Sequence, residues 1–229
     1  GGSDRPRRDS RQPENLHPFT LSRQLQDIRV GILTIREKWE KMLGLPSFDR
    51  KEDDYKDLER SVSMADAAAD GGYCLLIHGN VLPTPDLIKA VKKLKNGELI
   101  TVNGSAGIVF RFTKKEILEK HQIRVKRAVP FKGPVDTICF PWDITHLNDK
   151  AIRQDFTLLT KKRRSQRIPS SNKVTNRSAI FIEKGAKVSH CIINASTGPV
   201  YIGRNAELMD GSMIRGPFAI GEKACLKMG

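Results

Sequence analysis

A fixed step of six between apolar positions runs through the C-terminal part of the chain. The positions are Ile182, Val188, Ile202, Leu208, Ile214, Ile220 and Leu226. This period fits neither an α-helix nor a hairpin. It is typical of hexapeptide coils in a parallel β-helix, where each apolar residue points inward and three hexads complete one coil. The sequence therefore predicts β-helix coils over 182–229, with a bulge at 197–199 where the step is interrupted.

A different pattern over residues 16–160 predicts an α/β domain. The expected elements are a buried strand at 73–77, a helix capped by Thr84 with Pro85 at its first position, strands at 98–102 and 107–110, and a short helix opened by a capping box at 113–116. Alternation of strands and helices indicates a largely parallel sheet.

The segment 25–43 has apolar residues near helical spacing. We expect two successive helical pieces, broken near 31–34. Thr34 and Glu37 have the spacing of a capping box, and Gly44 is a stop signal for the second piece.

Polar residues follow the first strand of the predicted sheet. His78, Gly79 and Asn80 come directly after the apolar run. Ligands of α/β sheets bind at the carboxyl ends of strands, so this tripeptide is a candidate for substrate contact. A plain turn from strand to loop explains it equally well.

Charge is concentrated in two segments of this 229-residue chain, which has a formal net charge of +14. Residues 89–127 and 161–187 each carry a net charge of +8, while the rest is near neutral. Such a concentration of positive charge is also typical of proteins that bind nucleic acid. The second segment has no interleaved aromatic residues, so we favour a basic linker between domains over nucleic-acid binding.

Other features narrow the class of protein. The chain has no apolar stretch long enough for a transmembrane helix, so we expect no membrane partner. Residues 1–15 are predicted to be a cloning-derived linker followed by a flexible polar arm. The four widely spaced cysteines, each among apolar neighbours, predict reduced, buried thiols in a cytoplasmic protein.

Four segments resemble a known family. They are residues 19–23 (FTLSR), 27–40 (DIRVGILTIREKWE), 140–143 (FPWD) and 198–203 (GPVYIG). They look like divergent sugar nucleotidyltransferases related to the bifunctional N-acetylglucosamine-1-phosphate uridyltransferase family. The resemblance implies an incomplete α/β nucleotidyltransferase-like domain at 16–160, a basic linker at 161–181, and the first coils of a left-handed parallel β-helix at 182–229.

This resemblance also implies a reaction. A sugar 1-phosphate and a nucleoside triphosphate condense to a nucleotide sugar and pyrophosphate, with Mg²⁺ holding the phosphates. The implied site residues are Arg23 and Asp143 for catalysis, His17, Arg29, Arg36, His78, Gly79 and Asn80 for substrate, and Asn80 and Asp143 for the metal. A guanidinium suits phosphate contact, although Arg36 has an alternative pairing with Glu40 on a helix face.

Departures from the family pattern keep a second hypothesis open. The N-terminal glycine-rich phosphate loop is not found in residues 1–15, and Asn80 stands where a carboxylate would face Mg²⁺. The β-helix coils of an acyltransferase site are expected beyond residue 229. The alternative is a non-catalytic protein that binds a nucleotide sugar, or a scaffold that assembles as a trimer through its β-helix.

Overall fold

The computed structural model describes residues 25–48, 61–65, 72–103, 106–113 and 124–227. The described chain forms two compact units. The first contains residues 34–144 together with the chain before residue 29, and the second contains residues 29–33 and 145–229. We refer to them as the sheet unit and the coil unit. None of the helices in the described ranges is both long and apolar enough to cross a bilayer.

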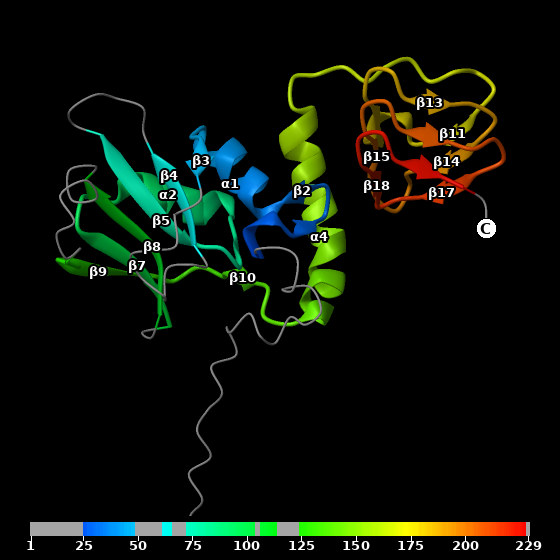
Figure 1. The fold of residues 1–229 in the computed structure, drawn as a ribbon. Helices are drawn as coiled ribbons and strands as arrows, with labels where there is room; N and C mark the ends of the chain where they lie inside the picture. Colours follow the sequence, from blue (N-terminus) through cyan, green and yellow to red (C-terminus); the bar gives the residue numbers. More distant parts are fainter. Residues whose placement is uncertain (1–24, 49–60, 66–71, 104–105, 114–123, 228–229) are drawn as a thin grey trace, which may run out of the picture. The chain divides into compact units, whose positions relative to one another are not determined.

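The sheet unit is built on one six-stranded sheet (Figure 1). Its elements are η3 (Leu25–Asp27), α1 (Ile35–Leu43), β3 (Ser47–Phe48), β4 (Ser61–Ala65), β5 (Tyr73–His78), β6 (Val81–Leu82), α2 (Pro85–Lys93), β7 (Glu98–Val102), β8 (Ala106–Thr113), β9 (Arg127–Phe131) and β10 (Asp136–Thr137). The strand order in the sheet is β3-β4-β5-β8-β7-β9.

The prediction of a largely parallel sheet is wrong. Only β7 and β9 pair in parallel, and the other neighbours are antiparallel. Helix α2 does connect two strands of the same direction, β5 and β7, as the sequence indicated. However, β8 follows β7 as a hairpin partner and lies between them, so each of those strands has an antiparallel neighbour.

Local sequence signals predicted α1 and α2, the α-helices described between residues 34 and 103. Thr34 and Glu37 form the predicted capping box of α1, and Gly44 ends the helix in the left-handed conformation with φ 69°. Thr84 caps α2 by accepting a hydrogen bond from the backbone nitrogen of Leu87. The helix predicted from 113–116 lies outside the described residues.

The coil unit contains three parallel three-stranded sheets that the chain visits in turn (Figure 1). Its strands are β11 (Lys173–Thr175), β12 (Ile180–Ile182), β13 (Lys187–Val188), β14 (Ile192–Asn194), β15 (Val200–Ile202), β16 (Glu207–Leu208), β17 (Met213–Arg215), β18 (Phe218–Ile220) and β19 (Cys225–Leu226), with η5 (Arg177–Ala179) between β11 and β12. The sheets are β11-β14-β17, β12-β15-β18 and β13-β16-β19.

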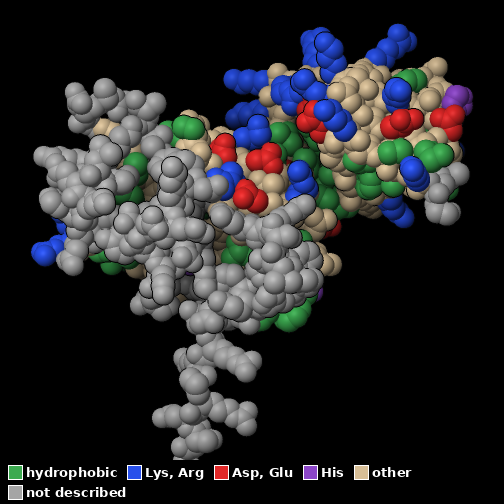
Figure 2. All heavy atoms as spheres, in the orientation of Figure 1, with side chains coloured by type: hydrophobic (Ala, Val, Ile, Leu, Met, Phe, Trp, Pro, Cys, Tyr) green, Lys and Arg blue, Asp and Glu red, His purple; other side chains and the backbone are tan. Residues whose placement is uncertain are grey.

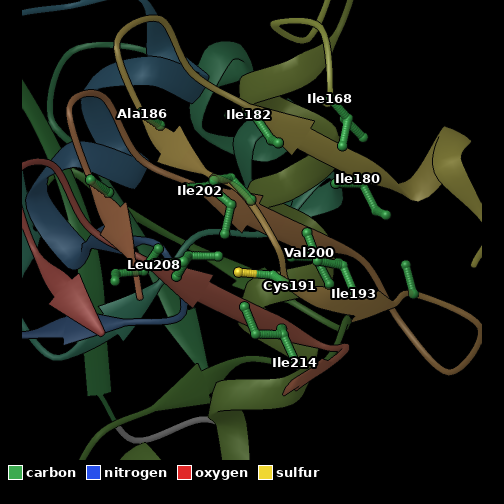
Figure 3. Close-up of a cluster of buried hydrophobic side chains, with 14 residues drawn as sticks. Ile168, Ile180, Ile182, Ala186, Cys191, Ile193, Val200, Ile202, Leu208 and Ile214 are labelled. Carbon is green, nitrogen blue, oxygen red and sulfur yellow. The ribbon is translucent and has the colours of Figure 1, made fainter. Parts of the chain in front are cut away.

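The inward residues of these sheets form one apolar core (Figure 3). Ile182 stacks on Ile202 and then Ile220, and Val188 stacks on Leu208, as the six-residue step predicts. Ile193 in β14 fills the core position between Val188 and Ile202. The extra residues that interrupt the step lie at 196–199, between the buried Ala195 and the start of β15.

The coils begin earlier than the sequence indicated. Strands β11 and β12 lie within or across the segment 161–181 that was predicted to be a basic linker, and they pair with β14 and β15. Sequence reasoning missed these strands because the segment is rich in charged residues. A short strand can carry charged residues on its outer face, since only one of its faces points inward. Val174 packs against the core while Lys173 next to it is exposed.

Helix α4 (Pro141–Thr160) was not predicted, and its second half packs within the coil unit. Ile152, Phe156 and Leu159 cover the outer side of the β12-β15-β18 sheet, where they meet Phe181 and Tyr201. Their three- and four-residue spacing is a helical signal that sequence reasoning had not used.

Residues 29–33 also pack in the coil unit, where β1 (Arg29–Val30) and β2 (Leu33–Thr34) form a small two-stranded sheet. The first helical piece predicted at this point is therefore wrong beyond η3. Gly31 turns the chain with φ +77°, and the Asp155 carboxylate accepts hydrogen bonds from the backbone nitrogens of Ile32 and Leu33 at 2.9 and 3.0 Å. A charged acceptor that binds two buried amides favours this turn over a helix.

All four cysteines are free thiols, as predicted. Cys74 and Cys191 are buried, but Cys225 is exposed. Its side chain alternates with Leu226 in β19, and Leu226 is the residue that packs inward.

Candidate functional site

A hollow of about 190 Å³ lies in the sheet unit at the ends of β5 and β7. Its lining residues are His78, Asn80, Val81, Val102, Asn103, Ile108, Val135 and Thr137. His78 and Val102 end their strands, so the hollow is at the carboxyl ends of β5 and β7, two strands of the same direction that flank β8. The sequence predicted ligand contact at this strand end, from His78, Gly79 and Asn80. Of these three residues, His78 and Asn80 line the hollow.

The folding of the surrounding chain explains why this edge is held in place. Strand β5 is buried at four consecutive positions, 74–77, and then turns through Gly79. Strand β6 pairs with β10, and the backbone nitrogen of Ile138 donates to the Asn80 carbonyl at 2.9 Å. The buried Trp39 indole donates to the Val81 carbonyl at 2.8 Å, which anchors the same wall to α1.

Asn80 is the most informative residue of the hollow. Its side chain is 2% exposed, and its amide nitrogen Nδ2 has no hydrogen-bond partner among the described residues. Buried polar atoms are nearly always paired, and an unpaired donor costs about 1–3 kcal/mol. Asn80 therefore borders the hollow with a buried donor that no described residue satisfies.

The donor set of the hollow does not fit a protein-held Mg²⁺ ion, which prefers carboxylate oxygens. Among the described residues, the lining provides an imidazole, two amides and a hydroxyl, but no carboxylate. The unpartnered atom of Asn80 is a hydrogen-bond donor, which cannot coordinate a cation. In addition, no group of three or more His, Cys, Asp or Glu side chains in the described ranges could hold a metal.

Two predicted site residues have other contacts in the sheet unit. The Arg36 guanidinium donates to Asp27 at 2.8 Å and to the Ser47 hydroxyl at 3.1 Å, rather than pairing with Glu40. One Asp143 carboxylate oxygen accepts the backbone nitrogens of Cys139 and Phe140, each at 2.8 Å, at the start of α4. Neither residue lines the hollow.

The other predicted residues are outside the sheet unit or outside the described chain. Arg29 is exposed in β1, and its Nη1 donates to the Ile32 carbonyl. His17 and Arg23 lie outside the described residues.

Sequence reasoning missed Asn103 and Thr137. Asn103 directly follows β7, as Asn80 follows β5, so the same strand-then-polar signal was present. Thr137 had no such signal, because only the pairing of β10 with β6 brings it to this edge.

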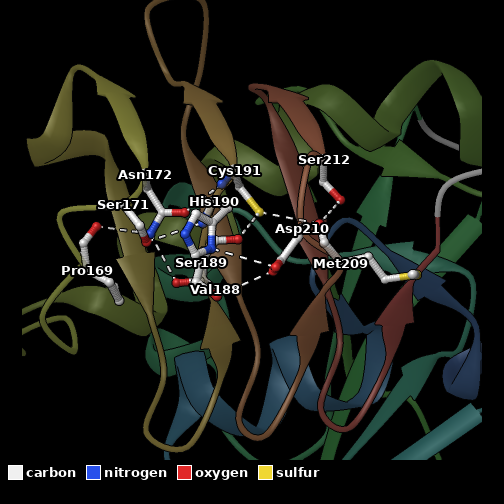
Figure 4. Close-up of polar contacts among 10 residues, drawn as sticks. All are labelled: Pro169, Ser171, Asn172, Val188, Ser189, His190, Cys191, Met209, Asp210 and Ser212. Atoms are coloured by element: carbon white, nitrogen blue, oxygen red, sulfur yellow. Dashed lines mark hydrogen bonds and ion pairs between the residues drawn. The ribbon is translucent and has the colours of Figure 1, made fainter.

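In the coil unit, Asn172 joins successive coils through its buried amide (Figure 4). Its Nδ2 donates to the carbonyls of Pro169 and Val188, and its Oδ1 accepts from the Cys191 nitrogen. Burial raises the pKa of the Cys191 thiol, which favours the neutral form. With its polar atoms satisfied, this cluster holds a corner of the coils together.

A second network lies where α4 leads into the coils. Arg163 donates to both carboxylate oxygens of Glu183 at 2.9 and 2.7 Å, and the Tyr201 hydroxyl donates to one of them at 2.8 Å. Burial opposes the charge of Glu183, but these hydrogen bonds outweigh it and hold the pKa of Glu183 below its usual value. Burial and the neighbouring carboxylate raise the pKa of Tyr201, so the phenol stays neutral.

Figure 2 shows lysine and arginine side chains gathered along the upper edge of the coil unit, with acidic side chains beside some of them. One of the cations of segment 161–187, Arg163, is paired with Glu183.

A family model described as sugar nucleotidyl transferase matches residues 8–164. The matched segment includes the whole sheet unit from residue 34 to 144 and ends just after α4. No curated protein and no solved structure matches the chain.

Proposed function

Since this chain belongs to the sugar nucleotidyl transferase family, we propose that it transfers a nucleotidyl group from a nucleoside triphosphate to a sugar 1-phosphate. An oxygen of the sugar phosphate attacks the α-phosphorus, and the bond from that phosphorus to the bridging oxygen of the β-phosphate breaks. Pyrophosphate leaves with the electron pair. Transfers of this kind depend on positioning and on neutralising charge, and they need little covalent chemistry from the protein.

The observation that carries this proposal is the hollow at the carboxyl edge of β5 and β7, inside the segment that the family model matches. In our proposal His78 and Asn80 orient one substrate there, with Gly79 giving the turn between them. Because the lining residues that the structure describes include no carboxylate, we assign Asn80 no metal. A magnesium ion would accompany the phosphates instead.

The remaining predicted contacts stay proposals. Arg23, His17 and Arg29 are candidates for the phosphates. Arg36 must break its bonds to Asp27 and Ser47 before it can contact a substrate. Asp143 uses only Oδ2 for the two backbone nitrogens that it caps, so a metal would bind its other oxygen.

For the coil unit we propose a left-handed parallel β-helix of the acyltransferase-related type, which assembles as a trimer. The three parallel sheets and the six-residue apolar step support it. This proposal includes the relation to the bifunctional N-acetylglucosamine-1-phosphate uridyltransferase group. Light scattering on the purified protein measures the oligomeric state, and a monomer at micromolar concentration would contradict the trimer.

The test of the activity is pyrophosphate release. Each nucleoside triphosphate is mixed with a panel of sugar 1-phosphates and Mg²⁺, and released pyrophosphate is measured with a coupled assay. One pair should turn over, and Asn80→Ala should reduce kcat/KM about tenfold or more, because the amide that orients the substrate is lost. Asn96→Ala is the matched control, since that exposed asparagine lies outside the hollow and contacts Arg111.

A second function is favoured by the absence of a carboxylate from the described part of the lining. A protein of this family that has lost its metal ligand would bind a nucleotide sugar without turning it over. Measurable binding of nucleotide sugars together with no pyrophosphate release from any pair would establish this alternative and refute the transferase.

A further inference from the structure

We propose that one edge of the coil unit binds the phosphate backbone of double-stranded nucleic acid without reading its sequence. This edge lies at the start of the coils, and we call it the basic edge. It is formed by six exposed cations, Lys161, Lys162, Arg164, Arg167, Lys184 and Arg204. The proposal is independent of the transfer reaction, because it concerns a different unit of the chain.

Hydrogen bonds fix the loop 161–167 onto the first corner of the coils. The backbone nitrogen of Gln166 donates to the Ile182 carbonyl at 2.8 Å. The Gln166 side chain accepts a hydrogen bond from the Gly185 nitrogen at 2.9 Å through its Oε1. The cations of this loop therefore lie beside the corner that carries Lys184.

The next corner stacks on the first one. Ile182 pairs with Ile202, and the Asn205 nitrogen donates to the Lys184 carbonyl at 3.3 Å, so Lys184 and Arg204 lie on successive coils. Paired strands are about 4.8 Å apart, which is less than the Debye length of about 8 Å at physiological salt, so these two charges repel each other. Figure 2 shows lysine and arginine side chains gathered along this unit's upper edge.

The charges of the basic edge are not neutralised within the described chain. None of its six cations forms an ion pair with an acidic side chain in the ranges that the structure describes. Glu183, the acidic residue of segment 161–187, is bonded to Arg163 and Tyr201. Repulsion among unpaired like charges opposes a compact fold, and an anionic partner removes it.

The sequence favoured a linker as the explanation of this charge, but the structure shows strands of the coils in the same segment. A linker therefore does not account for it. A nucleic-acid duplex can meet several of these cations at once, since it carries about one negative charge per 1.7 Å of its axis.

The surroundings of the basic edge favour a duplex over a bilayer or a single strand. The exposed large apolar side chains of the described chain are Val125, Trp142, Ile192, Met209 and Met213, and none belongs to this edge. Stable attachment to a bilayer takes an apolar signal besides charge. Single strands are bound by stacking on aromatic rings, and the aromatic residues next to this edge, at 181 and 201, are buried. Contact with a phosphate backbone needs neither feature.

The experiment measures binding of the full chain to a fluorescently labelled DNA duplex by anisotropy over a range of salt concentrations. We expect a Kd of about 1–100 μM near physiological salt, with log Kd rising linearly with log salt. An RNA duplex of the same length decides which duplex is preferred. Single-stranded DNA, phosphatidylserine vesicles and polyglutamate are the other probes.

The key variant combines Lys161→Gln, Lys162→Gln, Arg164→Gln and Arg167→Gln. Duplex binding should weaken about tenfold or more, and the salt slope should fall by about 2–4, because each lost phosphate contact removes about 0.9 from it. These side chains make no hydrogen bond within the described chain, so the melting temperature should not fall.

The matched control replaces four exposed lysines of the sheet unit, at 89, 92, 93 and 95, with glutamine. Its net charge falls by the same amount as that of the key variant. We expect it to bind the duplex within about twofold of the native chain, since its cations lie outside the basic edge.

Four results would overturn the proposal. One is no duplex binding at low salt, and a second is an equal loss in the key variant and the control, which would make binding a property of net charge alone. A third is tighter binding of the single strand than of either duplex. The fourth is binding of vesicles or polyglutamate that the key variant abolishes while it leaves duplex binding unchanged.

Discussion

Asp155 offers the sharpest test of how the chain around residues 29–33 is held. Its carboxylate is 3% exposed, and one of its oxygens, Oδ2, accepts the backbone nitrogens of Ile32 and Leu33 at 2.9 and 3.0 Å. The perturbation is Asp155→Ala, which removes the acceptor and leaves both amides buried. Asp155→Asn keeps an oxygen at the same place without the charge.

The magnitude follows from the two orphaned donors. Each buried N–H without a partner costs about 1–3 kcal/mol, so the pair costs about 2–6 kcal/mol. Removing a buried carboxylate offsets part of this, because its own desolvation disfavoured the folded state. We therefore expect Asp155→Ala to lower the free energy of unfolding of the coil unit by about 2–4 kcal/mol, and Asp155→Asn by about 1 kcal/mol.

Two measurements check this expectation. Urea denaturation gives the change in stability, and native-state hydrogen exchange reports the amides of Ile32 and Leu33 individually. A loss of about 2 kcal/mol corresponds to exchange about 30 times faster at these two amides. Asp149→Ala is the matched control on the same helix. Asp149 is 61% exposed and pairs with Arg153, so its removal should change stability by less than about 1 kcal/mol.

Some outcomes would contradict the role of Asp155 in this turn. If Asp155→Ala and Asp149→Ala cost the same, or if the Ile32 and Leu33 amides exchange at the native rate in Asp155→Ala, the carboxylate does not hold this turn. Fast exchange already present in the native chain would refute it equally.

Two further predictions concern the coil unit. Gly31→Ala should lower the stability of this unit by about 2–4 kcal/mol in urea denaturation. The added Cβ would lie 2.6 Å from the Ala151 carbonyl carbon, and the backbone at this position has φ +77°. A neutral result would show that α4 is free to shift. Glu183→Gln should be destabilising near pH 7, because Arg163 and Tyr201 bond the charged carboxylate. The pKa of Glu183 is lower in the folded state than its ordinary value of 4.5, so this stabilisation is present above about pH 4.5 and is lost as the pH falls further. The difference between native and variant chains should therefore shrink when denaturation is repeated near pH 3, and a constant difference would contradict the assignment.

Part of the candidate site was predictable from the chain alone. An apolar run followed by His78, Gly79 and Asn80 marked the end of a buried strand, and a strand end is a property of local sequence. The same signal after Val102 pointed to Asn103 but had not been used. Thr137 could not be found in this way, because it reaches the hollow through the pairing of two strands that are distant in sequence.

Roles for charged residues were much less predictable. Arg36 and Asp143 both have the chemistry of a site, and the structure shows each with local partners instead. A charged side chain forms hydrogen bonds or ion pairs with whichever groups the fold brings close to it. The sequence does not specify which groups those are.

By itself the sequence determined the features that depend on neighbours along the chain. These are the capped helices α1 and α2, the strand β5, and the core positions of the coils, where a repeated step of six leaves one stacking arrangement for the apolar residues. Tertiary structure alone decided that β8 lies between β5 and β7, that residues 29–33 form a turn bound to Asp155, and that Asn80 keeps an unpartnered amide at the edge of a hollow. The physical reason is common to all three. Each depends on what the fold brings together from distant parts of the sequence: β5 with β8, Asp155 with residues 29–33, and the surroundings of Asn80. Local preference cannot specify such contacts.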